Sequence, residues 1–540
     1  MKHFIYIAIL LLGIMTVSSC QDNDWDDHYG LNTNATQNLM EVLQANSQYT
    51  EFCRVLKEQK LDSLLTSDQT YTVWAPTNEA MAAYADDGDA ADHFVKNHIN
   101  RFIYNAPDLT DTSYVRIKML NGKFQDYTRA TGDYTFAGVN VAAGDIAATN
   151  GLVHTITGVA PFYLNIYENI NQTDKSTDSL STYLRSFDVY TFDKAQSSVV
   201  GKNELGELVY DSVFNYTNEY MRNYGDLWLE DSLYTMVVPS NTGWKAGYAA
   251  TEKYFRTFGR LLSSTTSTIS VPTRKYEVGD RLADSLSMMY AKENMANSLV
   301  FRGKVDPANA DGDSLVSTSG NVFHHPADLF NGSQEETVSN GTVWRTDTWN
   351  YKPEDCFLKK IIVEAEDTRD RTDAYANVFS RSSSNTIYSD SVSEQKYIEV
   401  NASTTNARTQ PMVQFSIPNT LAATYNVYCV FAPAAAYTEE ATADSTRVRF
   451  YLNYVHADGS MKEDAVINGT ITNGNKMTRM LVGQLTLPFA NYSASIFTGD
   501  ETQDDDCVRL RVQTNVAASE TTKLSRTMRI DCIILEPVIE

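Results

Sequence analysis

The chain has 540 residues, of which 42% are hydrophobic and 21% are charged, and this globular composition excludes wholesale disorder. Its formal net charge is −24, from 44 basic and 68 acidic residues, so its surface repels nucleic acid phosphates and we expect no nucleic acid partner. At about 150 residues per domain, the length predicts three or four domains.

The first twenty residues predict an export signal. They read MKHFIYIAILLLGIMTVSSC, in which Lys2 forms a short basic region and residues 4–17 form an apolar run too short to span a bilayer comfortably. This pattern predicts a signal peptide over residues 1–19. The closing Val-Ser-Ser-Cys resembles a bacterial lipobox, which implies that Cys20 carries a lipid that fixes the protein to a membrane surface. The alternative is ordinary cleavage near Ser19, with Cys20 unmodified.

An acidic stretch, QDNDWDDHYG, lies directly behind Cys20. Such a stretch predicts a solvated tether over residues 20–30. It also resembles the acidic export signal of lipoproteins of the Bacteroidetes type. That resemblance implies a lipid-anchored protein of the outer membrane that faces the cell exterior.

The region 31–165 shows helical patterns followed by strand patterns. Apolar residues at helical spacing over 39–65 predict helices, the run YTVW at 71–74 predicts a strand, and an apolar stripe predicts a further helix over 90–104. Asn121-Gly122 is a strong hairpin signal. Short strands are predicted on both sides of it and beyond, at 114–120, 134–141 and 152–156.

The chain contains an internal repeat. DQTYTVWAPTNEAM at 68–81 recurs as DSLYTMVVPSNTGW at 231–244, and TNGLVH at 149–154 recurs as SNGTVW at 339–344. Repeats this far apart predict duplicated domains. In each copy a hydroxyl residue, Thr77 or Ser240, follows Pro and is predicted to cap a helix. The next residue, Asn78 or Asn241, is predicted to bond the backbone of the turn.

An ordered set of motifs identifies the first copy. YTVWAPTNEAM is followed by NHI at 97–99, MLNGK at 119–123 and DIAATNGLVHTITGV at 145–159, and this set resembles a fasciclin (FAS1) domain. The resemblance implies an α+β fold over 31–165 and a role in adhesion to cells or matrix. The repeat then implies a second, degenerate fasciclin-like domain over 175–352, in which Trp344 takes the place of His154.

Beyond Pro353 the pattern changes to the alternation of β-strands. Short strands separated by turn residues predict an all-β jelly-roll sandwich over 358–540. The predicted strands lie at 410–418, 424–433, 446–460, 477–488, 507–515 and 528–537.

Three pieces of this region, IIVEAED at 361–367, VQFSIPNTLAATYNVYCVFA at 413–432 and MRIDCIILE at 528–536, resemble the galactose-binding-like sandwiches of carbohydrate-binding modules. In that family a glutamate of the opening strand and an aspartate of the closing strand often hold a structural Ca²⁺. The resemblance places these ligands at Glu364 or Glu366 and at Asp531, and hard carboxylate oxygens suit Ca²⁺. The alternative is that the three carboxylates are ordinary charges at strand ends.

The chain contains six cysteines, and five remain if Cys20 carries lipid. Five thiols cannot all pair, and the sequence does not fix the pairing among Cys53, Cys356, Cys429, Cys507 and Cys532. The exported compartment is oxidising, which allows a bridge among the last three.

The sequence contains no GxSxG, HExxH, P-loop or GxGxxG motif, so we expect a non-enzymatic protein. Sugar rings stack on exposed aromatic side chains, and Tyr437, in the polar loop APAAAYTEEATADS, is the candidate ligand-binding residue. The expected function is adhesion or the binding of a glycan or matrix ligand at the cell surface, accessory to an outer-membrane glycan-uptake system of the SusC/SusD type. The alternatives are a glycan-processing accessory enzyme that the sandwich targets, and a structural spacer for surface partners.

Overall fold

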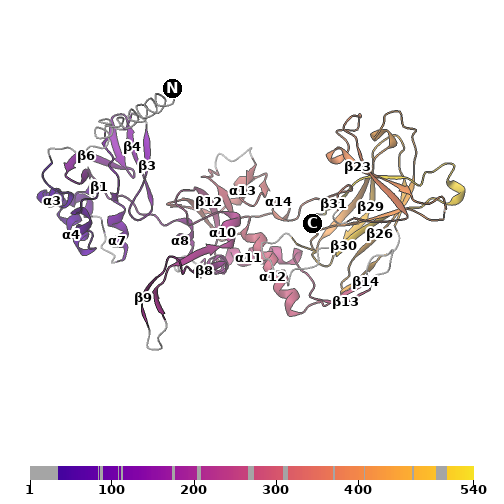
Figure 1. Cartoon of the computed structure of the whole chain (residues 1–540), viewed down its shortest axis with the longest axis horizontal. Helices are drawn as coiled ribbons and strands as arrows, with labels where there is room; N and C mark the ends of the chain where they lie inside the picture. Colours follow the sequence, from indigo (N-terminus) through magenta and orange to yellow (C-terminus); the bar gives the residue numbers. More distant parts are fainter. Residues whose placement is uncertain are drawn as a thin grey trace, which may run out of the picture. The chain divides into compact units, whose positions relative to one another are not determined.

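The structure is a computed structural model, and it describes residues 35–82, 84, 89–106, 109–110, 113–172, 177–202, 208–265, 273–307, 314–368, 371–406, 408–464, 467–493 and 507–539. The predicted signal peptide, Cys20 and the acidic tether lie outside these residues. The chain divides into two units, which are described separately below (Figure 1). Unit 1 contains residues up to Asn165 with the short segments 229–231 and 338–340, and unit 2 contains the rest.

Unit 1 combines a helical layer with one seven-stranded sheet, in the order β2-β1-β7-β6-β5-β4-β3. Its helices are α3 (Leu39–Ala45), α4 (Thr50–Glu58), α5 (Asp62–Leu65), α6 (Asn78–Met81) and α7 (Asp89–Lys96). Its strands are β1 (Tyr71–Pro76), β2 (Ile99–Asn100), β3 (Tyr114–Lys118), β4 (Phe124–Ala130), β5 (Asp133–Phe136), β6 (Val139–Ala148) and β7 (Gly151–Ile156). The apolar face predicted over 39–65 is buried in the core of this unit.

Two sequence expectations for unit 1 are wrong in detail. The helix expected over 90–104 ends at Lys96, because Ile99 and Asn100 form β2, which pairs with β1. The strand expected over 134–141 is broken by a tight turn at Ala137 and Gly138, both of which have positive φ, so it forms β5 and β6 of a hairpin. Pairing with β1 decides the first case and the conformation of the turn decides the second, and hydrophobic periodicity reports neither.

The repeated motif forms a strand–turn–helix joint in unit 1. Strand β1 lies parallel to β7, with Tyr71 opposite Gly151. A Cβ at Gly151 would collide with the carbonyl of Tyr71, so only glycine allows the two strands to approach this closely. After β1, the hydroxyl of Thr77 accepts a hydrogen bond of 3.2 Å from the backbone N–H of Ala80, which confirms the predicted cap.

The sequence predicted that the side chain of Asn78 bonds its own turn, but the structure shows other partners. Its Oδ1 accepts a bond of 3.0 Å from the backbone N–H of Glu51, and its Nδ2 donates to the carbonyl of Ser47. It therefore ties the joint to the first turn of α4. In unit 2 the counterpart Asn241 accepts a bond of 2.9 Å from the backbone N–H of Ser179, in the first turn of α9. The repeat thus conserves a contact between elements, and the prediction of a local bond is wrong.

The first half of unit 2 repeats the central pairing of unit 1. Strand β12 lies parallel to β19 with Tyr234 opposite Gly341, and Ser240 caps α11 by accepting from the backbone N–H of Gly243 at 3.3 Å. Its helices are α8 (Ile166–Ile170), α9 (Asp178–Arg185), α10 (Glu219–Tyr224), α11 (Asn241–Thr251), α12 (Arg281–Ala296), α13 (Pro326–Leu329) and α14 (Pro353–Cys356). Its strands are β8 (Asp188–Phe192), β9 (Ser198–Lys202), β10 (Leu208–Asp211), β11 (Phe214–Asn218), β12 (Tyr234–Pro239), β13 (Leu261–Thr265), β14 (Thr273–Tyr276), β15 (Val300–Arg302), β16 (Leu315–Val316), β17 (Val322–Phe323), β18 (Gln334–Val338) and β19 (Gly341–Thr346).

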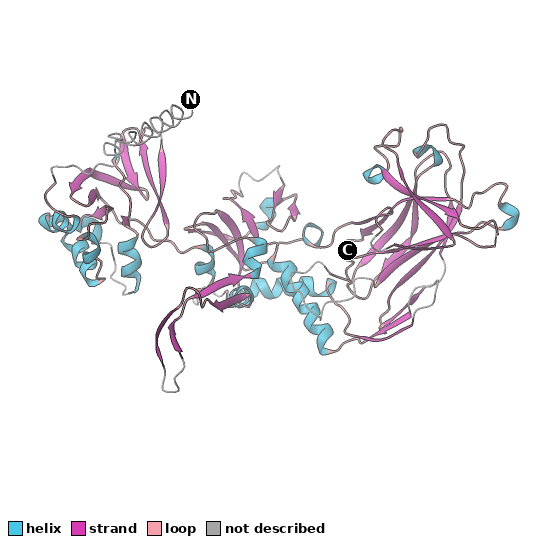
Figure 2. Cartoon of the chain, in the orientation of Figure 1, coloured by secondary structure: helices cyan, strands magenta, loops and turns pink. Residues whose placement is uncertain are grey.

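The second half of unit 2 is a β-sandwich, and Figure 2 shows that strands dominate it. One sheet has the order β22-β23-β31-β25-β29 with β20 on β31, and the other has the order β13-β14-β27-β26-β30-β24-β21 with β28 on β26. The six strands expected from the sequence are present. The strands of the sandwich are β20 (Ile361–Glu364), β21 (Arg371–Ala374), β22 (Ala376–Ser382), β23 (Lys396–Ala402), β24 (Met412–Ser416), β25 (Thr424–Phe431), β26 (Arg447–Val455), β27 (Ser460–Glu463), β28 (Ile467–Ile471), β29 (Thr478–Thr486), β30 (Val508–Thr514) and β31 (Met528–Pro537).

The first half of unit 2 and the sandwich share one core. The hairpin β13–β14 adds to the edge of the second sheet, where Arg274 pairs with Met461. Phe255 and Tyr290 are buried in the same apolar cluster as the inward residues of both sheets. The carbonyl of Arg256 also accepts a 2.7 Å bond from the backbone N–H of Ala490. The two halves of unit 2 are therefore packed as one body.

The five cysteines within the described residues are all buried, and no disulfide joins any two of them. The bridge considered among Cys429, Cys507 and Cys532 is therefore absent from this part of the chain. Burial raises the pKa of the Cys429 thiol well above its ordinary value, so this thiol is an inert core group.

Candidate functional site

The candidate site lies where the opening and closing strands of the sandwich meet. Strand β20 pairs antiparallel with β31, and Glu364 stands opposite Cys532. On its other side β31 pairs with β25, where Cys429 faces Ile533 and Phe431 faces Ile530. Two residues of β31, Asp531 and Cys532, therefore face one residue of β25. This β-bulge turns Asp531 toward the end of β20.

The structure brings together the carboxylates that the sequence nominated. A carboxylate oxygen of Glu364, one of Asp531 and the sulfur of Cys532 lie within 4.8 Å of one another. Glu366 joins the wall of the same pocket, two residues beyond Glu364. We refer to Glu364, Glu366 and Asp531 as the carboxylate cluster.

A loop that the sequence did not nominate closes the cluster. The backbone N–H of Ser393 donates to Asp531 Oδ1 at 3.0 Å, and its hydroxyl donates to Glu364 Oε1 at 2.7 Å. The next residues, Glu394 and Gln395, both have positive φ, at 48° and 58°. Two consecutive non-glycine residues with positive φ carry backbone strain, and the hydrogen bonds of Ser393 help to keep the loop in this conformation.

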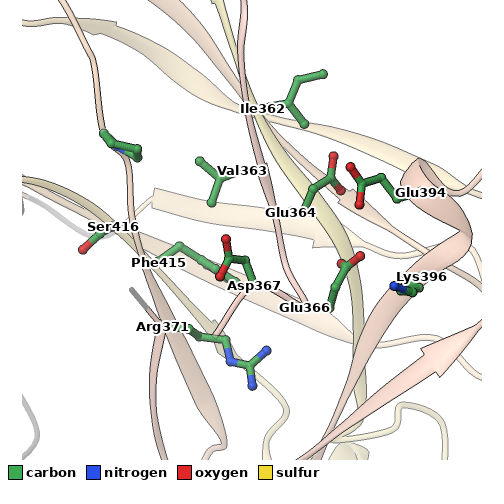
Figure 3. Close-up of a pocket in the computed structure, with 11 residues that line it drawn as sticks. Ile362, Val363, Glu364, Glu366, Asp367, Arg371, Glu394, Lys396, Phe415 and Ser416 are labelled. Atoms are coloured by element: carbon green, nitrogen blue, oxygen red, sulfur yellow. The ribbon is translucent and has the colours of Figure 1, made fainter. Parts of the chain in front are cut away.

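Two members of the cluster, Glu364 and Glu366, line a pocket of about 520 Å³ (Figure 3), and Asp531 lies beside Glu364. In Figure 3 the carboxylates of Glu364 and Glu394 point toward one another, and the carboxylate of Glu366 lies near Lys396. The opposite part of the pocket carries Arg371, Phe415 and Ser416, from β21 and β24. The pocket is therefore acidic on one side and mixed on the other.

The acidic groups of the pocket are poorly compensated. Burial raises the pKa of Asp531 to about 7, and the adjacent Glu364 and Glu366 add to the increase. Burial also raises the pKa of Glu364 and of Glu366. Among the described residues, no hydrogen-bond partner reaches Glu364 Oε2 or either carboxylate oxygen of Glu366, although all three atoms are buried. Hard cations are coordinated by carboxylate oxygens, and these oxygens are buried without hydrogen-bond partners, so the residues fit Ca²⁺.

The candidate ligand-binding residue Tyr437 lies elsewhere. It follows the short helix η5 (Ala434–Ala436), and it is not among the described residues that line the carboxylate pocket. Its side chain is exposed, and the guanidinium of Arg381 lies 4.7 Å from the centroid of its ring. Arg381 was not predicted as its neighbour, because strand β22 (Ala376–Ser382) was not predicted.

The buried histidines are structural groups of unit 1. His98 Nδ1 donates to the carbonyl of Phe94 at 2.8 Å, and its Nε2 accepts from the backbone N–H of Ala160 at 3.0 Å. His154 Nε2 donates to the carbonyl of Tyr104 at 2.7 Å, and its Nδ1 accepts from the backbone N–H of Asp145. Backbone groups thus bond both nitrogens of each ring, and burial lowers the pKa of both histidines, which favours the neutral form.

Comparison with known proteins identifies one domain of the chain. Residues 47–160 match the family model of the fasciclin domain, so this part of the chain is a fasciclin domain. Over 137 residues the chain is 27% identical to transforming growth factor-beta-induced protein ig-h3 of Oryctolagus cuniculus, which covers 22% of this chain and 19% of that protein. The chain therefore spans about a fifth of the length of the curated relatives that it matches.

Solved structures with related folds include a fasciclin domain pair and a carbohydrate-binding module. The domain pair of the insect cell adhesion molecule fasciclin I is 14% identical, with 58% of this chain and 99% of that chain covered and a TM-score of 0.21. The C-terminal family 22 carbohydrate binding module of Clostridium thermocellum Xyn10B is 18% identical, with 32% of this chain and 92% of that chain covered and a TM-score of 0.20. At TM-scores this low, neither likeness identifies a function.

Proposed function

We propose that this chain is a non-enzymatic cell-surface lipoprotein that adheres to a glycan or matrix ligand. The observation that carries the proposal is the fasciclin domain at 47–160, since a pair of such domains occurs in an insect protein described as a cell adhesion molecule. The β-sandwich of the same chain adds a second binding module. Several weak modules on one anchored chain gain avidity from their shared attachment.

The proposed anchor is a lipid on Cys20, with the chain on the outer face of an outer membrane. The support is the sequence of residues 1–30, in which a short apolar run ends in a small-residue stretch before Cys20 and an acidic tether follows. Among the described residues, no helix is long and apolar enough to cross a membrane. On such a surface the chain would be an accessory to a SusC/SusD-type glycan-uptake system.

Cells that carry the full chain test this function. We expect them to be retained by at least one immobilised polysaccharide or matrix protein, and we expect the purified chain to release no sugar from it. The Cys20→Ala variant is expected to leave the membrane fraction and to abolish retention. Turnover of the polysaccharide would instead support an accessory enzyme, and the absence of both binding and turnover would support a spacer.

We also propose that the carboxylate cluster holds a structural Ca²⁺. The support is the set of buried carboxylate oxygens of Glu364 and Glu366 without hydrogen-bond partners, beside the buried Asp531. A bound cation would neutralise these charges and tie β20 to β31 and to the loop at Ser393.

The thermal midpoint of the full chain tests the calcium proposal. We expect Ca²⁺ to raise the midpoint of unit 2 over that in EDTA, and Asp531→Asn to remove the response. The matched control is Glu439→Gln, which neutralises an exposed carboxylate of the same sandwich and is expected to keep the response. A midpoint that is equal in Ca²⁺ and in EDTA contradicts the proposal.

A further inference from the structure

The solvent face of the first sandwich sheet carries a row of polar and aromatic side chains. Phe379 on β22 stands opposite Glu399 on β23, which stands opposite Arg529 on β31. The neighbours Val378, Ile398 and Ile530 pack into the core. Because side chains alternate along a strand, Phe379, Glu399 and Arg529 share the outer face.

Two aromatic rings stand on this face with a guanidinium between them. Arg381 lies over the ring of Phe379, 5.1 Å from its centroid, and over the ring of Tyr437, 4.7 Å from its centroid. The two ring centroids are therefore at most about 10 Å apart. Phe379 is 44% exposed and Tyr437 is 52% exposed. We refer to Phe379, Arg381 and Tyr437 as the aromatic platform.

The charges beside the platform are paired with one another. Arg381 donates to Glu399 Oε1 at 2.8 Å, and Arg529 donates to Glu399 Oε2 at 3.0 Å. Arg529 also donates to Asp444 Oδ1 at 2.5 Å. Two guanidiniums and two carboxylates cancel, so this patch is close to neutral in a chain whose net charge is −24.

The ion-pair network also fixes polar groups in place. Asn401 Nδ2 donates to Glu399 Oε1 at 3.2 Å, and Thr527 donates to Asn401 Oδ1 at 2.8 Å. Under the platform, the hydroxyl of the fully buried Tyr397 has no hydrogen-bond partner among the described residues. A row of fixed donors and acceptors beside two apolar rings matches the two surfaces of a sugar, whose C–H faces stack on rings and whose hydroxyls bond to polar groups.

We propose that the aromatic platform binds a neutral polysaccharide, with Phe379 and Tyr437 stacking on sugar rings and the Glu399–Arg529–Asp444 network bonding their hydroxyls. This inference rests on the proposed function and names the ligand class and the site. The ligand is neutral because each guanidinium of the site already has a carboxylate partner, and because the acidic surface of the chain repels polyanions. Arg381 is a positioning residue that holds the two rings, and its charge is paired with that of Glu399.

Affinity electrophoresis of the full chain tests the proposal. The gels contain soluble xylan, glucomannan or mixed-linkage β-glucan as neutral probes, and polygalacturonate as the acidic probe. We expect at least one neutral probe to retard the wild-type chain, and Phe379→Ala and Tyr437→Ala each to weaken that binding about tenfold. Tyr437→Phe keeps the ring and is expected to bind as the wild type does.

Two controls separate the platform from general effects. Leu481→Ala removes a 56% exposed apolar side chain from β29 of the same sheet and is expected to leave binding unchanged. All variants are compared by their thermal midpoints, so that a loss of folding is recognised. Glycan binding that survives the Phe379→Ala/Tyr437→Ala double variant overturns the platform and leaves the proposed function standing. Binding to polygalacturonate alone overturns the neutral ligand, and binding to none of the four probes counts against both.

Discussion

Acid is expected to destabilise the fasciclin domain through one histidine. Burial lowers the pKa of His98 from 6.5 to about 4, and the hydrogen bond to the carbonyl of Phe94 opposes only part of that shift. Between these two values the unfolded chain binds a proton that the folded chain does not. The stability that neutral His98 contributes is therefore complete above pH 6.5 and is lost as the pH falls toward 4. At about 1.4 kcal/mol per pH unit, the loss is about 3 kcal/mol.

Hydrogen-exchange mass spectrometry of peptides covering β1 and β7, in increasing urea, measures the unfolding free energy of unit 1 within the full chain. The deficit of His98→Asn relative to the wild type is expected to shrink by about 3 kcal/mol between pH 7.5 and pH 4, because the variant has no group to protonate. Val153→Ala, a core variant of the same unit with no titrating group, is the control whose deficit stays constant. A constant deficit for His98→Asn as well would refute the reasoning.

Three further changes in unit 1 have expected outcomes. Gly151→Ala places a Cβ against the carbonyl of Tyr71 and should lower the free energy of unfolding by more than about 3 kcal/mol. The change should appear as less soluble protein or as a lower urea midpoint of unfolding. Asn78→Ala removes the bond that joins the turn to α4 and should cost about 1 kcal/mol in the same assay. Lys123→Ala leaves the carboxylate of Glu230, which is 11% exposed, without its 2.6 Å ion pair, and should cost about 3 kcal/mol. The double change of Lys123 to Ala and Glu230 to Gln should recover part of that loss, and no recovery would contradict the ion-pair account.

The sequence predicted the fasciclin part of the fold well, because its signals are local. Thr77 and Ser240 cap helices as expected, and the run YTVW forms part of strand β1. These features depend on the chemistry of a few adjacent residues. The bond made by Asn78 was assigned to the wrong partner, because its real partner at Glu51 is brought close only by the packing of α4.

The sequence did not predict that the first half of unit 2 shares a core with the sandwich. Strand β14 carries no sign that its edge partner is β27, which lies far along the chain. The helix α12, which holds Tyr290, packs into the sandwich core, and the sequence analysis did not predict this contact. Edge pairing and shared cores depend on tertiary contacts, and these leave no fixed spacing in a single sequence.

The candidate site was half predicted. Glu364, Glu366 and Asp531 were nominated by resemblance, and the structure places Asp531 beside Glu364, while Glu364 and Glu366 line one pocket. Ser393 and Glu394 were missed, because their loop reaches the cluster through residues with positive φ, and residue type does not predict that conformation here. Likewise Tyr437 was nominated for its polar loop, whereas its partner Phe379 lies on a strand that was not predicted.

The carboxylate cluster and the aromatic platform are joined through two strands. Ser393, which bonds Glu364 and Asp531, lies just before β23, and β23 carries Glu399 of the platform network. On β31, Asp531 follows Arg529 by two residues, at the bulge opposite β25. Unbalanced charge in the cluster therefore acts on the same strand segments that position the ion pairs under Phe379 and Tyr437. A cation in the cluster would fix these segments before a ligand arrives, so that binding would not have to order them.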